Sequence, residues 1–212
     1  MQNGLNEVRE IYISIYPTLE KIASGLGEQL SHIFHDVEHI DRIICRVKSI
    51  DSLLIKSSKR MSDGSLKYSV PLKEIQDMIG ARVVVYYKTD VPPVKELIKR
   101  HFNRVEEMAV VPDDATKFGY EGFHMICFIP NSIFSSRENP DVGDFFELQI
   151  KTLYQHAWSQ SNHGLGYKPG AELSPDSQRM LAFIAAQSWG ADKALAELVM
   201  NRPQDLQEGG TH

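Results

Sequence analysis

The segment Phe145–Lys168 constrains the fold of this chain more than any other part of its sequence. From Phe146 to Lys151 apolar and polar side chains alternate strictly, which is the period of a β-strand with one buried face. One face would carry Phe146, Leu148 and Ile150, and the other Phe145, Glu147, Gln149 and Lys151. Thr152 then supplies a hydroxyl that can cap a helix running to about Asn162 and ending at the glycines that follow. The segment therefore predicts a strand that turns directly into a helix.

The second face of this strand carries a carboxylate, an amide and an ammonium group, on Glu147, Gln149 and Lys151. Such groups are costly to bury and useful beside a polar ligand. A strand face that simply meets solvent is the ordinary alternative, and the segment alone does not decide between the two.

Composition and charge limit the class of protein. Among the 212 residues 42% are apolar and 24% charged, which is ordinary for a soluble domain. No apolar run approaches the roughly 20 residues of a membrane span, and the N-terminus has no signal-peptide pattern. Cys45 and Cys127 stand apart, at no metal-like spacing, which favours reduced thiols in a cytoplasmic protein. The net charge of −5 disfavours a general nucleic-acid binder.

Apolar residues between Leu5 and Ile40 recur every three or four positions, which predicts helix, in two segments broken near Pro17 or Gly25–Gly27. Four residues of this stretch have spacings that resemble a metal-ligand set on a helix: His32, His35, Asp36 and His39. Because the sequence offers no clear further ligand cluster, it favours ordinary surface residues over a metal site here.

The segment that follows is suited to binding an anion. Alternation in Ile43–Ser49 places Arg46 and Lys48 on one face of a strand, and Ser49 can cap a helix beginning near Ile50. That helix has further polar and basic residues along one side: Ser52, Lys56, Lys59 and Arg60. Cations beside the free N–H groups of a helix N-terminus suit a polyphosphate. A solvated basic helix face is the alternative for the last two residues.

Asp77 breaks a local rule. Pro71–Met78 is predicted to be a short helix with Gly80 as its C-terminal cap, followed by a strand over Ala81–Tyr87. Asp77 then lies at the unfavourable end of the helix dipole, and such violations tend to mark functional sites. A Mg²⁺ ion needs only one or two carboxylates together with phosphate oxygens. An exposed acid at a frayed helix end fits this segment equally well.

The remaining pattern completes a mixed α/β (α+β) domain. It predicts helices over Asp90–His101 and Ser174–Asn201, the second with an apolar stripe, and strands near Arg104–Val111 and Gly122–Pro130. Tyr120, just before the last of these strands, can stack on a nucleobase or simply pack on the surface. We expect a sheet of about five strands, formed by residues 41–170, with a helical segment in 1–40, a C-terminal helix in 171–201 for packing or oligomerisation, and a tail in 202–212.

Four motifs, in this order, resemble the nucleotidyltransferase-like synthetase domain of RelA/SpoT-type alarmone synthetases. They are R-x-K-S-x-x-S-x-x-x-K at Arg46–Lys56, D-x-x-x-x-R at Asp77–Arg82, G-Y-x-x-x-H at Gly119–His124, and E-x-Q-I-K-T…H-A-W…H…Y-K at Glu147–Lys168. The chain has no room for a separate hydrolase domain, so it is similar to a small, single-domain member.

The resemblance implies a pyrophosphokinase of the stringent response. Such an enzyme transfers the β,γ-pyrophosphate of ATP to the ribose 3′-OH of GDP or GTP, with Mg²⁺, and so makes ppGpp or pppGpp. The resemblance also implies a cytoplasmic homo-oligomer, a dimer or tetramer, that does not contact membranes.

Carried over by position, the resemblance also assigns roles to residues. Asp77 and Glu147 would be catalytic and would hold the metal. The ATP-binding residues would be Arg46, Lys48, Ser52, Lys56, Arg60 and Arg82, with Arg46 and Arg82 on either side of the adenine. The acceptor nucleotide would be bound by Lys117, Tyr120, His124, Gln149, Lys151 and His156.

Several positions depart from the family pattern, and all lie on the acceptor side. They are Lys117 as the only basic residue of its loop, Gly122 in place of serine, Lys151 in place of arginine, and Gln160 and Asn162 where acids are common. One alternative is therefore a toxin-like relative whose acceptor is an adenine nucleotide or a tRNA 3′ end. For tRNA, the one obvious basic cluster is Lys95, Lys99, Arg100 and Arg104. A non-catalytic nucleotide-binding module is the second alternative, which two retained metal-side acids disfavour.

Overall fold

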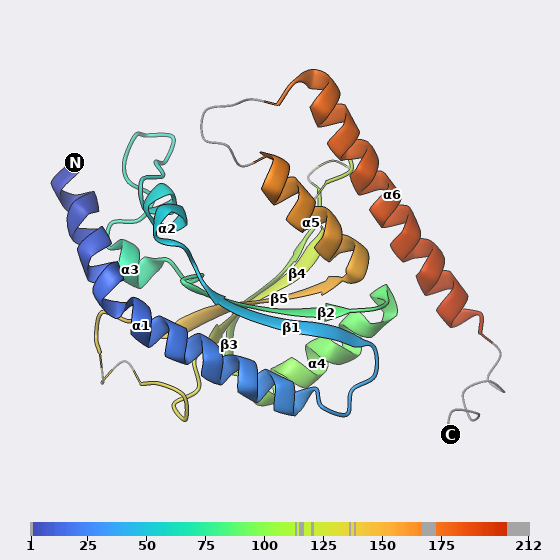
Figure 1. The fold of residues 1–212 in the computed structure, drawn as a ribbon, viewed down its shortest axis with the longest axis horizontal. Coiled ribbons are helices and arrows are strands. Elements are labelled where there is room, and N and C mark those ends of the chain that lie inside the picture. The colour runs from blue at the N-terminus through green and yellow to red at the C-terminus, as the bar shows by residue number, and fades with distance from the viewer. Residues whose placement is uncertain are drawn as a thin grey trace.

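The structure is a computed structural model that describes residues 2–112, 114, 117–119, 121–135, 137, 139–166 and 173–202, and only the backbone of residues 2, 3, 163 and 166. A five-stranded sheet has α1 and α4 on one face and α5 and α6 on the other (Figure 1). In chain order the elements are α1 (Gln2–Ile33), β1 (Ile40–Val47), α2 (Ile50–Ser57), α3 (Pro71–Glu74), β2 (Ile79–Val85), η1 (Lys88–Asp90), α4 (Val91–His101), β3 (Arg104–Val110), β4 (Gly122–Phe128), β5 (Phe145–Thr152), α5 (Leu153–Gly166) and α6 (Pro175–Met200).

The strand order is β1-β2-β5-β4-β3, and the sheet is mixed as predicted. The pair β2–β5 is parallel, and the pairs β1–β2, β4–β5 and β3–β4 are antiparallel. The strand that the sequence marks most clearly, β5, thus lies at the centre. Its alternation is confirmed, because Phe146, Leu148 and Ile150 are all fully buried against the core.

The helix α1 is continuous, so the predicted break near Pro17 or Gly25–Gly27 is wrong. A proline inside a helix costs about 3 kcal/mol, whereas each large apolar side chain buried on folding contributes roughly 1.5–3 kcal/mol. One face of α1 buries six such side chains against the sheet: Tyr12, Ile15, Leu19, Ile22, Leu26 and Leu30. Gly25 allows close packing, because a Cβ there would lie 3.1 Å from a methyl carbon of Ile133. The apolar face therefore outweighs the local signals.

The segment before β2 differs from its prediction. The helix α3 ends at Glu74 because the next residue is extended and turns its side chain into the core, where Ile75 and Met78 are 2% exposed. Asp77 therefore lies in a turn, three residues beyond α3, and the argument from the helix dipole does not apply. Gly80 is a residue of β2 and not a helix cap.

Other predicted bounds shift by a few residues. The strand β1 begins at Ile40 instead of Ile43, β2 covers Ile79–Val85, and α5 continues to Gly166. The caps of two helices are confirmed, because Ser49 accepts a hydrogen bond from the N–H of Ser52, and Ser174 one from the N–H of Ser177.

The C-terminal helix α6 packs on α5 and against η1. It is also tied to the end of β5, because the Thr152 hydroxyl donates a 2.7 Å hydrogen bond to the buried carboxylate of Asp192. Within the described part of the chain, no helix is both long enough and apolar enough to cross a membrane.

Candidate active site

The predicted site residues gather on the sheet face that α5 partly covers, opposite α1. Strand register explains this, since Arg82 of β2 pairs with Gln149 of β5, which pairs in turn with His124 of β4. Glu147, one pleat away, pairs with Gly80. A Cβ at Gly80 would meet no atom within 4 Å, so the glycine leaves the sheet surface open beside the carboxylate.

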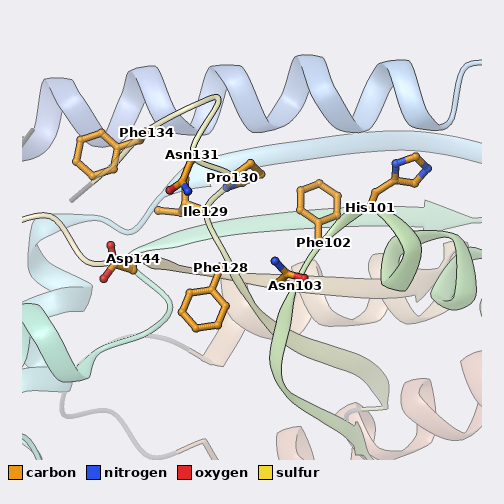
Figure 2. A pocket seen from close by; sticks show the side chains of 9 residues that line it. All are labelled: His101, Phe102, Asn103, Phe128, Ile129, Pro130, Asn131, Phe134 and Asp144. Carbon is orange, nitrogen blue, oxygen red and sulfur yellow. The ribbon is translucent and has the colours of Figure 1, made fainter. Parts of the chain in front are cut away.

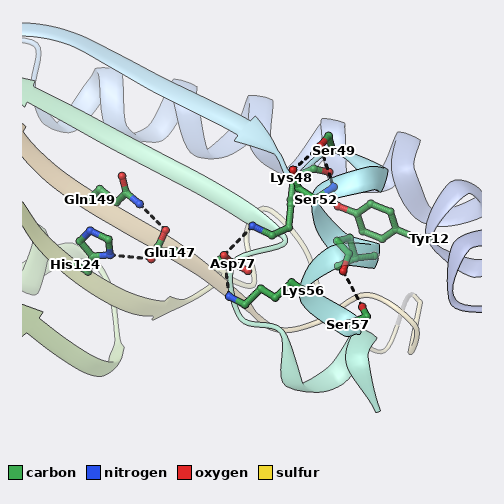
Figure 3. Close-up of polar contacts among 11 residues, drawn as sticks. Tyr12, Lys48, Ser49, Ser52, Lys56, Ser57, Asp77, His124, Glu147 and Gln149 are labelled. Atoms are coloured by element: carbon green, nitrogen blue, oxygen red, sulfur yellow. Dashed lines mark hydrogen bonds and ion pairs between the residues drawn. The ribbon is translucent and has the colours of Figure 1, made fainter. Parts of the chain in front are cut away.

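Two lysines converge on Asp77 at one end of this face (Figure 3). The Nζ atoms of Lys48 and Lys56 lie 2.9 and 3.0 Å from Asp77 Oδ2. Lys48 directly follows β1, and Lys56 lies on α2. Ser49, at the N-terminus of α2, donates a 2.8 Å hydrogen bond to the hydroxyl of Ser52. The structure thus brings together three of the predicted phosphate-binding side chains and one predicted catalytic acid.

The charge of Asp77 is set by these neighbours. Burial raises the pKa of Asp77, but the hydrogen bonds and positive charges of Lys48 and Lys56 outweigh it and hold the pKa below its ordinary value. Asp77 is therefore ionised at neutral pH. Its other oxygen, Oδ1, is buried and has no hydrogen-bond partner among the described residues.

Glu147 lies next to Asp77 in the view of Figure 3 and is held through both of its oxygens. Oε1 is 2.9 Å from Nδ1 of His124, and Oε2 accepts a 2.7 Å hydrogen bond from Nε2 of Gln149. Burial raises the pKa of Glu147, yet the two contacts lower it more, while the negative charge of Asp77 works against them. The net result is an ionised carboxylate whose orientation is fixed.

These two carboxylates fit a magnesium ion. Mg²⁺ uses one or two carboxylates and completes its shell with water and phosphate oxygens. Oδ1 of Asp77, which has no hydrogen-bond partner among the described residues, can serve as a ligand of such an ion. Glu147 lies on β5, which pairs with β2, the strand that follows Asp77. In the described ranges, no group of three or more His, Cys, Asp and Glu side chains could hold a metal ion.

Arg82 joins the two halves of the predicted site. Its guanidinium donates to Oε1 of Gln149 from Nε (3.2 Å) and NH2 (2.9 Å), and NH1 lies 3.1 Å from Nδ1 of His156. The sequence had placed Arg82 with ATP, and Gln149 and His156 with the acceptor. The structure brings the three into one hydrogen-bonded group.

Lys151 is the least accessible of the predicted residues, with 1% of its surface exposed. Its ammonium donates a 2.9 Å hydrogen bond to Ser159 of α5, so the side chain lies beneath that helix. This geometry lends no support to the prediction that Lys151 contacts the acceptor.

The outer predicted residues are less tightly placed. Arg46 and Arg60 are exposed, and the guanidinium of Arg60 donates to the carbonyl of Gly64 in the loop after α2. Lys117 is also exposed, 4.0 Å from Asp114. Tyr120 lies outside the described residues, so its stacking role stays a prediction.

Sequence reasoning missed Tyr12, which supports the site from below. Its hydroxyl donates a 2.7 Å hydrogen bond to the backbone carbonyl of Lys48. Burial, the neighbouring Tyr16 and the negative charge of Asp77 raise the pKa of Tyr12 above its ordinary value, so the phenol keeps its proton. In the sequence Tyr12 was one member of an apolar stripe, and nothing local distinguished it.

A cavity of about 380 Å³ lies elsewhere, where α4 ends and β4 leads into the following loop (Figure 2). Its walls include Phe102, Phe128 and Phe134, together with Asn103 and Asp144. None of the predicted site residues lines it, so the cavity is separate from the polar face of the sheet.

Comparisons with known proteins point to one family. The family described as "Region found in RelA / SpoT proteins" matches residues 45–172. GTP pyrophosphokinase YjbM of Bacillus subtilis is 25% identical over 168 residues, covering 77% of this chain and 74% of the relative. GTP pyrophosphokinase YwaC of the same organism is also 25% identical, covering 79% and 77%.

Solved structures show the same fold. Small alarmone synthetase 1 of Bacillus subtilis, bound to its product pppGpp, has a TM-score of 0.69 at 20% identity and covers 88% of this chain and 95% of that one. A GTP pyrophosphokinase family protein from Streptococcus pneumoniae has a TM-score of 0.67 at 20% identity, covering 95% of both chains. The family match spans more than half of the sequence, and this chain therefore belongs to the RelA/SpoT family.

Proposed function

We propose that this chain is a pyrophosphokinase that transfers the β,γ-pyrophosphate of ATP to the ribose 3′-OH of GDP or GTP, forming ppGpp or pppGpp. Two relatives in Bacillus subtilis are named GTP pyrophosphokinases, and structures of small alarmone synthetase 1 from that organism contain pppGpp or AMPCPP, an ATP analogue. The observation that carries the proposal is the joining of Asp77 to two lysines beside a fixed Glu147 on one open sheet face.

The lysine end of the site would bind the triphosphate of ATP. Lys48 and Lys56 present two ammonium groups beside the N-terminus of α2, and Ser52 adds a hydroxyl in the first turn of that helix. Positive charge and free N–H groups at one place are the usual requirement for a polyphosphate. Positioning and charge neutralisation of this kind supply most of the catalysis in phosphoryl transfer.

Asp77 and Glu147 would hold Mg²⁺, which would offset the negative charge that develops during transfer. Glu147 would also accept the proton of the acceptor 3′-OH. The 3′ oxygen then forms a bond to the β-phosphorus of ATP, the bond between that phosphorus and the α,β-bridging oxygen breaks, and AMP leaves with the bridging oxygen. Since both Glu147 oxygens are engaged, the base must exchange one contact, with His124 or Gln149, for the hydroxyl.

Acidic neighbours offset part of the charge of the basic cluster that a tRNA acceptor would use. Lys95, Lys99 and Arg104 lie 3.5, 3.2 and 3.7 Å from the carboxylate of Glu107, and Lys99 also pairs with Glu96 at 3.1 Å. A free nucleotide is therefore the better supported acceptor.

We further propose that residues 41–170 form the synthetase domain of a cytoplasmic enzyme, with α1 completing its core, and that α6 mediates a dimer or tetramer. Several large apolar side chains of α6 are more than half exposed in the single chain: Met180, Phe183, Leu198 and Met200. A second copy would cover them.

One labelling experiment tests the function. Purified protein is incubated with Mg²⁺, γ-labelled ATP and, separately, GDP, GTP, ATP or tRNA, with an Asp77→Asn variant as the control. Label in ppGpp or pppGpp, lost in the variant, is the expected result. Label in an adenine nucleotide or tRNA would move the chain to the toxin-like alternative, and no transfer to any acceptor would leave a binding module.

A further inference from the structure

The guanidinium of Arg82 is held from two directions. Gln149, on the neighbouring strand, accepts from Nε and NH2, and His156, on α5, contacts NH1. Oε1 of Gln160, one turn further along α5, is 3.5 Å from the same NH1 nitrogen. A strand and a helix thus supply acceptors along two edges of one planar group.

We infer that His156 is a positioning residue for Arg82, and so belongs to the ATP side of the site and not to the acceptor side. The inference rests on the proposed function, together with the place expected for Arg82 from the four motifs, against the adenine of ATP. As a neutral imidazole on α5, His156 fixes the guanidinium plane on which that base would stack. The helix that covers the site thereby contributes to binding of the pyrophosphate donor without touching it.

The chemistry of the pair decides which nitrogen carries the proton. An arginine side chain has five N–H donors and no acceptor, so a hydrogen bond between NH1 and Nδ1 requires Nδ1 to accept. The imidazole proton must then reside on Nε2. A protonated ring, with N–H on both nitrogens, cannot accept this bond and would repel the guanidinium.

The surroundings of His156 favour the neutral ring. Burial lowers the pKa of His156 below its ordinary value, and the positive charges of Arg82, Arg42 and Lys151 lower it further. Asp41, on β1, opposes them. His156 therefore stays an acceptor at neutral pH and loses that ability only at a pH below the ordinary histidine range.

Holding the plane matters because a free arginine explores many rotamers. Loss of one such contact to a charged group should weaken binding of the stacked ligand by about tenfold. The loss should appear in the affinity and KM for ATP. It should leave kcat and the KM of the acceptor nearly unchanged, which a general distortion of the site would not do.

The test measures binding of AMPCPP by calorimetry from pH 5.5 to 8.0, so that it does not depend on turnover. His156→Ala should raise the Kd about tenfold at pH 7.5. His156→Asn should restore it, because Oδ1 of asparagine occupies the place of Nδ1 and accepts the same bond. His101→Asn, an exposed histidine at the end of α4 outside the site, is the matched control.

The pH dependence sharpens the test. Ionisation of the ligand's phosphates affects every variant equally, so the ratio of wild-type to His156→Asn Kd is the quantity to follow. This ratio should be near one at pH 7.5. It should rise as the pH falls, because His156 is protonated in the wild type whereas asparagine does not titrate. The ratio of the wild-type Kd to the His101→Asn Kd should not change with pH.

Several outcomes would overturn the inference. The first is an unchanged AMPCPP affinity in a His156→Ala variant that circular dichroism shows to be folded. The second is a His156→Ala variant in which only the KM for GDP or GTP is raised. The third is a ratio of the wild-type Kd to the His156→Asn Kd that stays constant with pH. If wild type shows the expected binding pattern yet transfers no pyrophosphate, the proposed function fails and the inference stands.

Discussion

Lys151 offers the sharpest test of the energetics of this fold. The side chain is 1% exposed, and its ammonium is hydrogen-bonded to Ser159 at 2.9 Å. Burial, together with the positive charges of Arg82 and Arg46, lowers the pKa of Lys151 to about 7, although Glu147 opposes the shift. We expect Lys151→Met to stabilise the protein at and below neutral pH, because methionine fills similar space and carries no charge.

The sign follows from proton binding. An unfolded lysine keeps its proton up to about pH 10.4, so between pH 7 and that value the unfolded chain binds a proton that the folded chain releases. The free energy of unfolding must therefore rise with pH in this window, by up to about 1.4 kcal/mol per pH unit. Over the whole window, the buried charge of Lys151 lowers the free energy of unfolding by at most roughly 4–5 kcal/mol. The hydrogen bond to Ser159 that Lys151→Met removes contributes about 1 kcal/mol.

The useful range is pH 7 to 8.5. Burial raises the pKa of Cys45 to about 11 and that of Cys127 to about 12. Unfolded thiols ionise from about pH 8.5, so above this pH both cysteines lower the free energy of unfolding. Their effect would then hide the rise that is due to Lys151. Within the range, wild type should gain about 1.5 kcal/mol more than Lys151→Met.

Urea unfolding, followed by circular dichroism and tryptophan fluorescence at pH 6.5, 7.0, 7.5 and 8.5, measures this. At pH 6.5 the Lys151→Met variant should be more stable by roughly 2–4 kcal/mol. Lys73→Met, an exposed lysine of α3, should leave the pH slope unchanged. Equal slopes for wild type and Lys151→Met, or a less stable variant at pH 6.5, would refute the reasoning.

Three further predictions concern activity and assembly. Asp77→Asn and Glu147→Gln should each lower the transfer rate on the order of a hundredfold or more in protein that still folds by circular dichroism; near-normal turnover by Asp77→Asn would remove the metal assignment. Tyr120→Ala should raise the KM of the acceptor by about five- to a hundredfold with little change for ATP, Tyr120→Phe should be mild, and Arg46→Ala should show the reverse. A loss of ATP binding in Tyr120→Ala would contradict this two-sided site. Sedimentation should find a dimer or tetramer, and a monomer at micromolar concentration with α6 intact would rule out assembly through that helix.

Local patterns in the sequence sufficed to predict the central strand and the starts of two helices. The alternation of Phe145–Thr152 and the serines at 49 and 174 act within a few residues, so the chain displays them locally. The fate of Pro17 depends on how well the rest of α1 packs, which is a property of the whole core. The same holds for Ile75, whose burial ends α3 and moves Asp77 into a turn.

The candidate site shows the same division. The motifs predicted which residues belong to the polar face, and strand register does bring Arg82, Gln149 and His124 into one row. The contact between Arg82 and His156, 74 residues apart, depends on how α5 crosses the sheet. The burial of Lys151 beneath α5 has the same origin, so neither followed from spacing in the sequence.

Under the proposed function, the pairing at Asp77 predicts that ATP changes the charges of the site as it binds. Without nucleotide, Lys48 and Lys56 both form an ion pair with the same carboxylate oxygen of Asp77. A triphosphate presents a higher negative charge than one carboxylate, so it draws both ammonium groups toward itself. Asp77 then regains an uncompensated charge in a half-buried place, a state that is unfavourable unless another cation arrives. The affinities for ATP and for a divalent cation are therefore linked through this one carboxylate, and each should be weaker when measured without the other.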